Sequence, residues 1–294
     1  MTYDIVLVGN YTKDTIVSPA GARQVDGGGF NYGAHVAAMM GLRAAAVTRL
    51  APEDRRVVER LEALGITVFP AWTPSSTRLE LRYPGSNPDE RIITVSSSAG
   101  PITLDQVRPL AGRAWLLNGS FRGEIPLELV RELRGKAEWL AADVQGFLRE
   151  NGPDGVLRAT PWSERDAVLG SLDVLKADAV EAAALAGEED PAAAARRIAA
   201  WGPRAIVVTH RDGVLVLCGG TLHAAPFRHR ELRGRSGRGD TCVAAYLCRR
   251  LEGASPWQAT LWAAAVTSLK LEAEGPLRAS RAEIERFLRE HYEV

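Results

Sequence analysis

A glycine-rich turn that leads into an aliphatic stretch, GRSGRGDTCVAAYLCRRL at 234–251, is the first place where residue types and spacing could do chemistry. Gly234, Gly237 and Gly239 permit close backbone approach, and Asp240 then opens a predicted helix. The unpaired N–H groups and partial positive charge at such a helix start suit a phosphate group that gains or loses a bond. By itself the same pattern also fits a helix that Asp240 merely caps.

A second glycine-rich turn and three acids could complete a site. The sequence DGGGFNYGAHVAAMMGL at 26–42 is another glycine turn that feeds a helix, and Asp14 lies just after the first apolar strand. Asp178 and Glu181 lie three residues apart at the entrance to a predicted helix. Two of these acids also have a structural interpretation, Asp14 as a turn former and Glu181 as a solvated residue of a first helical turn.

Short apolar runs alternate with helical patterns along most of the chain, and these elements must position the candidate residues. Apolar strands alternating with helices predict one doubly wound α/β domain over 1–294, with a mostly parallel sheet and helices on both faces. Ligands of such sheets collect at the carboxyl ends of the strands, which is where a glycine turn before a helix would lie. The predicted strands are 5–9, 44–50, 114–119, 138–144, 172–177, 205–210 and 214–219.

Two stretches, approximately 11–26 and 70–98, break that rhythm with an alternation of period two. Leu79 and Leu81 are expected to face one way and their charged neighbours the other, with a turn over 84–90. We expect these stretches to form a small antiparallel β lid over one rim of the domain, although they could merely extend the edge of the central sheet. Exposed lid strands could also pair across a homodimer.

The composition argues against several classes of protein. Lys and Arg total 36, as do Asp and Glu, so the formal net charge is zero and the chain lacks the basic surplus of a nucleic-acid or membrane-surface binder. We find no export signal and no apolar run long enough to span a membrane. Three cysteines without ligand spacing favour reduced thiols and a cytoplasmic location. The missing dinucleotide fingerprint argues against a dehydrogenase.

The order and spacing of these motifs resemble the ribokinase-like carbohydrate kinases, the PfkB family, over essentially the whole chain. Members share an N-terminal glycine turn before a helix, a central N-x-x-E motif and a C-terminal D-T-x-G-A-G-D motif, and the matching segments here are 26–42, 178–181 and 234–240. The resemblance implies a ribokinase-like fold and a kinase that uses ATP and Mg²⁺ to transfer the γ-phosphoryl group to a hydroxyl of a sugar or cyclic polyol. The segments 143–149 and 268–276 are similar to a subgroup that includes inositol-type kinases.

The resemblance implies a role for individual residues of this chain. Asp240 matches the acid that takes the proton from the substrate hydroxyl, and Gly237, Arg238 and Gly239 match the anion hole around the transferred phosphoryl group. Glu181 matches the glutamate that organises Mg²⁺ through water. The residues matched to substrate binding are Asp14, Gly28, Gly29 and either Asn31 or Tyr32, and those matched to nucleotide binding are Thr209, Gly213 and Asp178.

Several positions depart from the family pattern. Arg238 replaces a small residue of the anion hole, and its guanidinium could itself clamp phosphate oxygens. Gly234 and Arg235 stand where the family has Asp and Thr. Asp178 replaces the asparagine of N-x-x-E, and Arg211 replaces the first glycine of the nucleotide segment. These replacements add charge to the regions that the resemblance assigns to phosphate, metal and nucleotide.

The implied chemistry requires little covalent work from the protein, because phosphoryl transfer depends on in-line placement and stabilisation of negative charge. A helix N-terminus is expected to lower the pKa of Asp240, so this acid would orient the attacking hydroxyl and accept its proton late. Two alternatives share the scaffold. One is a nucleoside kinase, for which Phe30, Tyr32 and Tyr83 could supply a stacking surface, and the other is a ligand-binding or regulatory protein without activity.

Overall fold

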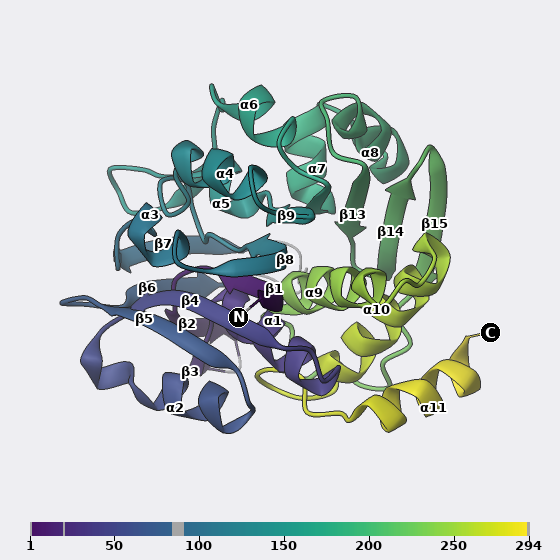
Figure 1. The fold of residues 1–294 in the computed structure, drawn as a ribbon, viewed down its shortest axis with the longest axis horizontal. Coiled ribbons are helices and arrows are strands. Elements are labelled where there is room, and N and C mark those ends of the chain that lie inside the picture. The colour runs from purple at the N-terminus through teal and green to yellow at the C-terminus, as the bar shows by residue number, and fades with distance from the viewer. Residues whose placement is uncertain (1, 20, 84–90, 293–294) are drawn as a thin grey trace.

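The computed structural model describes residues 2–19, 21–83 and 91–292, and these are built around one nine-stranded sheet (Figure 1). The strand order is β5-β4-β1-β8-β9-β12-β13-β14-β15, in which neighbours from β5 to β13 run parallel and the last two strands are antiparallel additions. The strands are β1 (Thr2–Val8), β4 (Ala44–Leu50), β5 (Thr67–Trp72), β8 (Ala111–Leu117), β9 (Trp139–Asp143), β12 (Val174–Asp178), β13 (Ala205–Thr209), β14 (Gly213–Cys218) and β15 (Thr221–Pro226).

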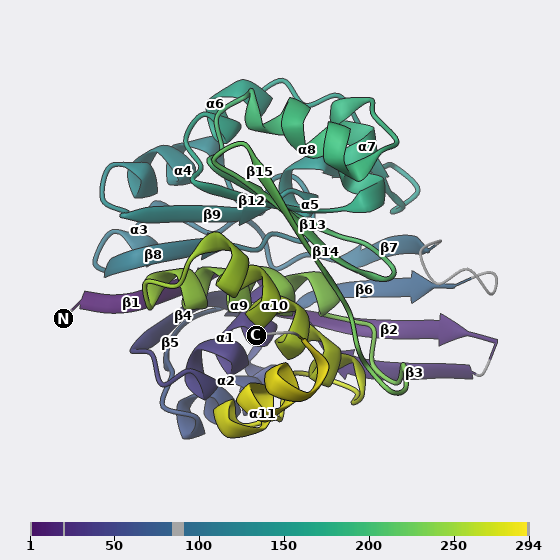
Figure 2. The ribbon, with the colours of Figure 1, turned by 90° about the vertical axis from the view of Figure 1, so that its right-hand side faces the viewer.

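The central strands are buried on both faces because their side chains alternate between two cores. In β1, Ile5 and Leu7 belong to one core, and Val6 and Val8 belong to the other. Helices cover both cores (Figure 2), which confirms the doubly wound α/β prediction. One layer contains α1 (Gly29–Met39), α2 (Arg56–Ala63), α9 (Arg238–Leu251), α10 (Pro256–Leu271) and α11 (Arg281–His291); the other contains α3 (Leu104–Val107), α4 (Leu127–Arg134), α5 (Gln145–Leu148), α6 (Arg165–Leu169), α7 (Ala179–Ala186) and α8 (Pro191–Ala199).

The winding of the sheet reverses at β1, which lies between β4 and β8. The chain proceeds outward through β4 and β5, then returns to β8 and winds the other way. Such a reversal opens a crevice at the carboxyl ends of the strands. Helices α1 and α9 begin side by side there, because a Cβ atom added at Gly29 would lie 2.5 Å from the Asp240 Oδ1 atom.

A smaller sheet, the lid, consists of β2 (Thr12–Ser18), β3 (Gly21–Asp26), β6 (Thr77–Arg82) and β7 (Ile92–Ser97) in the order β3-β2-β6-β7. Its outer pairs are antiparallel as predicted, but its central pair β2–β6 is parallel. The reason is that β2 follows β1 and β6 follows β5, so both strands leave the main sheet from the same end (Figure 2). The turn predicted over 84–90 lies outside the described residues.

The side chains of the lid alternate between buried and exposed as the sequence predicts, and its two edge strands differ in how far they are covered. Leu79, Leu81 and Ile93 are buried together on one face, while Arg78 and Arg82 are exposed. A short hairpin of β10 (Arg149–Asn151) and β11 (Leu157–Ala159) lies against β7, whereas β3 is largely exposed. The homodimer suggested by exposed lid strands stays a prediction.

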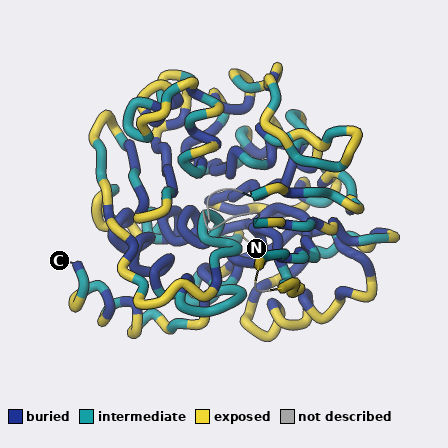
Figure 3. Tube along the Cα trace, turned by 180° about the vertical axis from the view of Figure 1, so that it is seen from behind, coloured by how far each residue is buried: buried dark blue, intermediate teal, exposed yellow. Residues whose placement is uncertain are grey.

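Figure 3 shows the main strands as buried segments inside exposed loops and outer helix faces. Among the described helices, none combines the length and apolarity needed to traverse a bilayer.

Candidate active site

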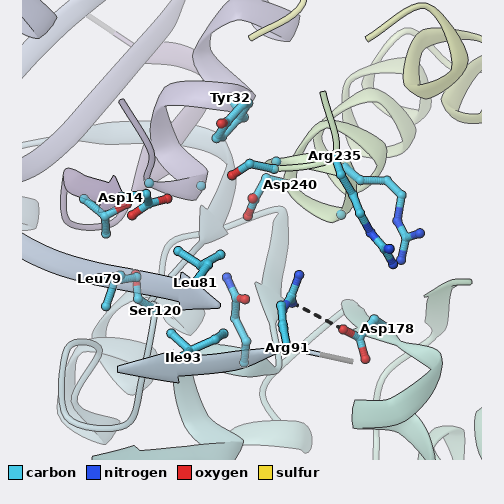
Figure 4. Close-up of a pocket in the computed structure, with 18 of the residues that line it drawn as sticks. Asp14, Tyr32, Leu79, Leu81, Arg91, Ile93, Ser120, Asp178, Arg235 and Asp240 are labelled. Atoms are coloured by element: carbon cyan, nitrogen blue, oxygen red, sulfur yellow. Dashed lines mark ion pairs between the residues drawn. The ribbon is translucent and has the colours of Figure 1, made fainter. Parts of the chain in front are cut away.

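Most of the predicted site residues line an open cavity between the lid and the carboxyl ends of the central strands, with about 770 Å³ of empty space that includes open solvent (Figure 4). Asp240 lies in its middle, and the cavity has two chemically different sides. We call them the lid side, which consists of Asp14, Tyr32, Leu79, Leu81 and Ile93, and the cationic side, which consists of Arg91, Arg149, Lys176, Arg235 and Arg238.

The N-terminus of α9 reaches the cavity through a turn that only glycine can make. Gly237 has a φ of 77°, and a Cβ atom there would lie 2.3 Å from the Tyr32 ring. At Gly239, a Cβ atom would lie 2.6 Å from the Lys176 Nζ atom. The missing side chains therefore bring the first N–H groups of α9, which have no partner within the helix, to the cavity beside a lysine ammonium.

Lys176 is a buried cation on β12 that the motif analysis did not single out. Its Nζ atom lies 2.9 Å from Asp143 Oδ2 at the end of β9 and 3.6 Å from Glu181 Oε2 on α7. Burial acts to lower the pKa of Lys176, but the two carboxylates outweigh it and the pKa is raised. Lys176 therefore carries its positive charge at neutral pH, next to the N-terminus of α9.

Asp240 is held by the other elements that meet at the crevice. The Asn118 side-chain amide, just beyond β8, donates a 3.3 Å hydrogen bond to Asp240 Oδ1. Contrary to the expectation from the helix N-terminus, the pKa of Asp240 is raised, because burial outweighs the cations around it. The raised pKa makes the carboxylate a better proton acceptor than an exposed aspartate.

Asp14, on β2, is the second acid of the cavity. Its side chain is buried and burial raises its pKa to about 7, while its Oδ1 atom has no hydrogen-bond partner among the described residues. Gly27 must be glycine, because a Cβ atom would lie 2.3 Å from Asp14 Oδ2. A buried carboxylate oxygen without a partner is costly unless a ligand satisfies it, so Asp14 is suited to accept a hydrogen bond from a substrate hydroxyl.

Asp178 and Glu181 form a capping box at the start of α7. The Glu181 amide donates to Asp178 Oδ1 at 2.8 Å, and Glu181 Oε2 accepts from the Asp178 amide at 2.7 Å. Glu181 Oε1 accepts from the Arg149 guanidinium at 2.5 Å. Burial acts to raise the pKa of Glu181, but Lys176 and Arg149 outweigh it and lower that pKa to about 2.

These contacts bear on the predicted magnesium site. Both oxygens of Glu181 already face cations or a backbone amide, and Asp178 Oδ2 faces Arg91 at 3.6 Å. Within the described residues, no group of three His, Cys, Asp or Glu side chains could hold a metal ion. The side chains present therefore do not fit a direct magnesium site at Glu181, and contact through water stays a prediction.

The remaining predicted residues divide between the cavity and its surroundings. Gly28, Tyr32 and Thr209 line the cavity, and the Thr209 hydroxyl is buried without a hydrogen-bond partner among the described residues. Asn31 is not part of the lining, and its side-chain amide donates to the Asp26 carbonyl at 3.2 Å. Gly213 also lies outside the lining. A Cβ atom there would lie 2.4 Å from the Ala225 carbonyl oxygen, so strand pairing explains this glycine.

Three lining or neighbouring residues were missed by the motif analysis. Asn118 lies near the end of the predicted strand 114–119, and a polar residue at that end of a parallel strand is a usable signal. Lys176 stands inside an apolar run, where a charge requires buried partners. Arg91 directly precedes β7 and carries no sequence signal, since only the folding of the lid over the sheet brings it to the cavity.

Comparisons with known proteins agree with this geometry. The model of the pfkB family of carbohydrate kinases matches residues 24–282. A pyrophosphate-dependent kinase in the ribokinase family, seen as a sulfate complex, is 36% identical with a TM-score of 0.89, covering 96% of this chain and 99% of that one. A complex of a pyrophosphate-dependent kinase in the ribokinase family with a pyrophosphate analog and myo-inositol is 34% identical with a TM-score of 0.88, at the same coverage.

A further structure describes a pyrophosphate-dependent myo-inositol-1 kinase converted into a myo-inositol-3 kinase by two substitutions. It is 33% identical with a TM-score of 0.88 and covers 98% of this chain and 100% of that one. A cytidine kinase of Thermococcus kodakarensis is 25% identical over 257 residues, 83% of this chain and 87% of its own length. The chain therefore belongs to the pfkB family of carbohydrate kinases, phosphotransferases with a hydroxyl acceptor.

Proposed function

We propose that this chain phosphorylates a hydroxyl of a cyclic polyol of the inositol type and uses pyrophosphate, rather than the ATP that the sequence suggested, as the phosphoryl donor. The similar structures that bind or use pyrophosphate and myo-inositol support this assignment. The observation that carries it in this chain is the charge of the cavity. Four arginines and one lysine line the cavity, and Asp240 lies in its middle.

The cationic side favours a donor made only of phosphate. Arg91, Arg235 and Arg238 line the cavity next to the N-terminus of α9, and guanidinium groups bind phosphate oxygens in pairs. In the described lining, the only Phe, Tyr or Trp is Tyr32, which belongs to the lid side and not to the cationic side. This chain thus offers strong contacts to phosphates and a weak surface for a base.

The lid side favours a cyclic polyol as acceptor. Leu79, Leu81 and Ile93 present an apolar surface to the cavity, and Asp14 lies beside Leu79 on the neighbouring strand, with a carboxylate oxygen that lacks a partner among the described residues (Figure 4). A cyclic polyol has C–H faces that can pack on the apolar surface and hydroxyls that can donate to Asp14.

The transfer step follows from these positions. The acceptor oxygen attacks the terminal phosphorus, an O–P bond forms, the bridging P–O bond of pyrophosphate breaks, and orthophosphate leaves. Asp240 accepts the hydroxyl proton, while the N–H groups of α9 and the Lys176 ammonium stabilise charge on the transferred group. Any Mg²⁺ that accompanies pyrophosphate would neutralise part of the donor's charge.

The proposal is tested by ³¹P NMR of the purified protein with pyrophosphate or ATP and a panel of inositols, sugars and nucleosides. Conversion of pyrophosphate and an inositol into orthophosphate and a phosphate ester, slowed by at least about a hundredfold in Asp240→Asn, is the expected result. Turnover of ATP with a nucleoside, and none with pyrophosphate, would instead establish the second candidate. That candidate, a nucleoside kinase, is supported by the cytidine kinase similarity.

We also propose a cytoplasmic location. Cys218, Cys242 and Cys248 are all unpaired in the structure, and Cys242 and Cys248 are buried in the core. Reduced thiols of this kind are typical of proteins that work in a reducing compartment.

A further inference from the structure

Lys270 is a buried lysine outside the described lining of the active-site cavity. It lies in the last turn of α10, which packs against α9 (Figure 1), and the residue is 1% exposed. A lysine is rarely buried to this extent, because taking its charge out of water is costly unless polar groups surround it. The contacts of its ammonium therefore indicate what the lysine does.

The Lys270 ammonium donates hydrogen bonds to two main-chain carbonyls of the turn before α9. Its Nζ atom lies 2.5 Å from the Gly234 carbonyl oxygen, and it also donates to the Ser236 carbonyl oxygen. The Tyr32 ring is close as well, with its centroid 5.5 Å from Nζ. Burial lowers the pKa of Lys270 to about 8, so the ammonium form still dominates at neutral pH.

The two carbonyls belong to the turn that sets the direction of α9. Ser236 directly precedes Gly237, the N-cap residue of α9, which has a positive φ. A main-chain hydrogen bond ties the start of this turn to the end of α10, because the Gly234 amide donates to the Leu271 carbonyl at 3.0 Å. Lys270 adds a link from the end of α10 to the last residue before the N-cap.

Loss of this link would disturb the N-terminus of α9. The carbonyl oxygens of Gly234 and Ser236 would lose the donor that they share, and a carbonyl without a partner tends to turn toward another donor or water. The Ser236 carbonyl and the Gly237 N–H lie in one planar peptide unit, so they turn together. The Lys270 charge also acts on Asp240, because it opposes the rise in pKa that burial causes there.

We propose that Lys270 is a positioning residue for phosphoryl transfer, whose ammonium fixes the turn over 234–236 and thereby directs the N–H groups at the start of α9 toward the transferred phosphoryl group. This inference rests on the proposed function for its donor and acceptor. Lys270 acts through the main chain of the turn and lies away from the acceptor. Its loss should therefore lower kcat much more than it raises KM for the acceptor.

Lys136 offers a matched control. Its ammonium also donates to main-chain carbonyls, those of Val107, Arg108 and Leu110, and it lies 5.1 Å from the centroid of the Trp115 ring. The three carbonyls precede β8, so they lie at the end of the strands opposite to the active-site cavity. The two lysines thus make the same kind of contact at opposite ends of the sheet.

The test compares steady-state kinetics of Lys270→Met and Lys136→Met, each shown by circular dichroism to be folded at the assay temperature. Lys270→Met should lower kcat by about tenfold to a hundredfold, as expected when a group at the reacting centre is displaced, with KM for the acceptor changed by less than about threefold. Lys136→Met should leave kcat unchanged. Equal kcat values in the two variants would refute the positioning role, whatever their thermal stabilities.

A more conservative variant keeps the test decisive if Lys270→Met does not fold. The side chain in Lys270→Gln is shorter and uncharged, so it can donate to one of the two carbonyls but cannot hold both. Its kcat should lie between those of Lys270→Met and the wild type. A wild-type kcat in Lys270→Gln would overturn the role of the ammonium.

The wild type is measured first with pyrophosphate and an inositol, and then with ATP and a nucleoside. Turnover of the first pair with equal kcat in Lys270→Met and Lys136→Met overturns this inference and leaves the proposed function intact. Turnover of the second pair alone overturns the proposed function, and the same comparison of variants with that pair then decides the role of Lys270. A wild type that turns over neither pair overturns both.

Discussion

Lys176 and Asp143, which come from adjacent parallel strands, form a buried ion pair with 2.9 Å between the ammonium nitrogen and the carboxylate oxygen. This pair fixes the lysine next to Gly239 at the start of α9. A buried ion pair is weak support for stability, since desolvation offsets much of its attraction. A position at the phosphoryl site gives the pair a function.

Replacing Lys176 with methionine should lower kcat by about 10² to 10³, the range measured for loss of one preorganised group at a developing charge. KM for the polyol should stay within about threefold, because Lys176 lies away from the lid side. Steady-state kinetics on a variant with a wild-type circular dichroism spectrum checks this. Unchanged kcat would show that the ion pair only supports the fold.

Asp240→Asn should lower kcat by about 10² to 10⁴ and leave polyol binding nearly unchanged, because the amide keeps the shape but cannot accept the proton. In the wild type, kcat/KM should fall as the pH drops through the raised pKa of Asp240, since the protonated acid is inactive. Calorimetric titration of polyol and a pH–rate profile measure the two effects. Near-normal turnover of the asparagine variant would exclude Asp240 as the base.

Asp14→Asn should separate stability from activity. Because the folded pKa of Asp14 is raised from 3.8 to about 7, ionising it destabilises the folded protein as the pH rises through this window. The variant should therefore melt at the wild-type temperature near pH 4 and several degrees higher above pH 7, while its KM for polyol rises more than about tenfold. Thermal unfolding of both proteins across pH checks this. A difference in melting temperature that stays constant at all pH values would argue against a buried, ionisable Asp14.

Glu181→Gln should cost about 3 to 5 kcal/mol of unfolding free energy, because the buried Lys176 and the partly buried Arg149 lose their shared carboxylate. The Mg²⁺ concentration for half-maximal activity should change less than about twofold if Glu181 holds Arg149 and Lys176 rather than a metal. Chemical unfolding measures the change in unfolding free energy. A Mg²⁺ titration of activity, after divalent ions have been removed with a chelator, measures the Mg²⁺ requirement. A large change in the Mg²⁺ requirement at unchanged stability would restore the metal role that the family resemblance implies.

The amino-acid sequence by itself determined the alternation of strands and helices, the glycine turns and the acids Asp14 and Asp240, because periodicity and backbone freedom are local properties. It also predicted the lid from the period-two pattern of its strands. The parallel pairing of β2 with β6 was decided only by the common exit of both strands from the main sheet.

Tertiary structure alone decided which charges meet. Arg91 precedes β7, whereas Lys176 and Asp178 lie on β12, and their sequence positions do not reveal that they border one cavity. The direction of the pKa shift of Asp240 was likewise set by burial, which outweighed the local effect of the helix N-terminus. Burial and long-range electrostatics depend on all elements packed around a group, and a local pattern cannot report them.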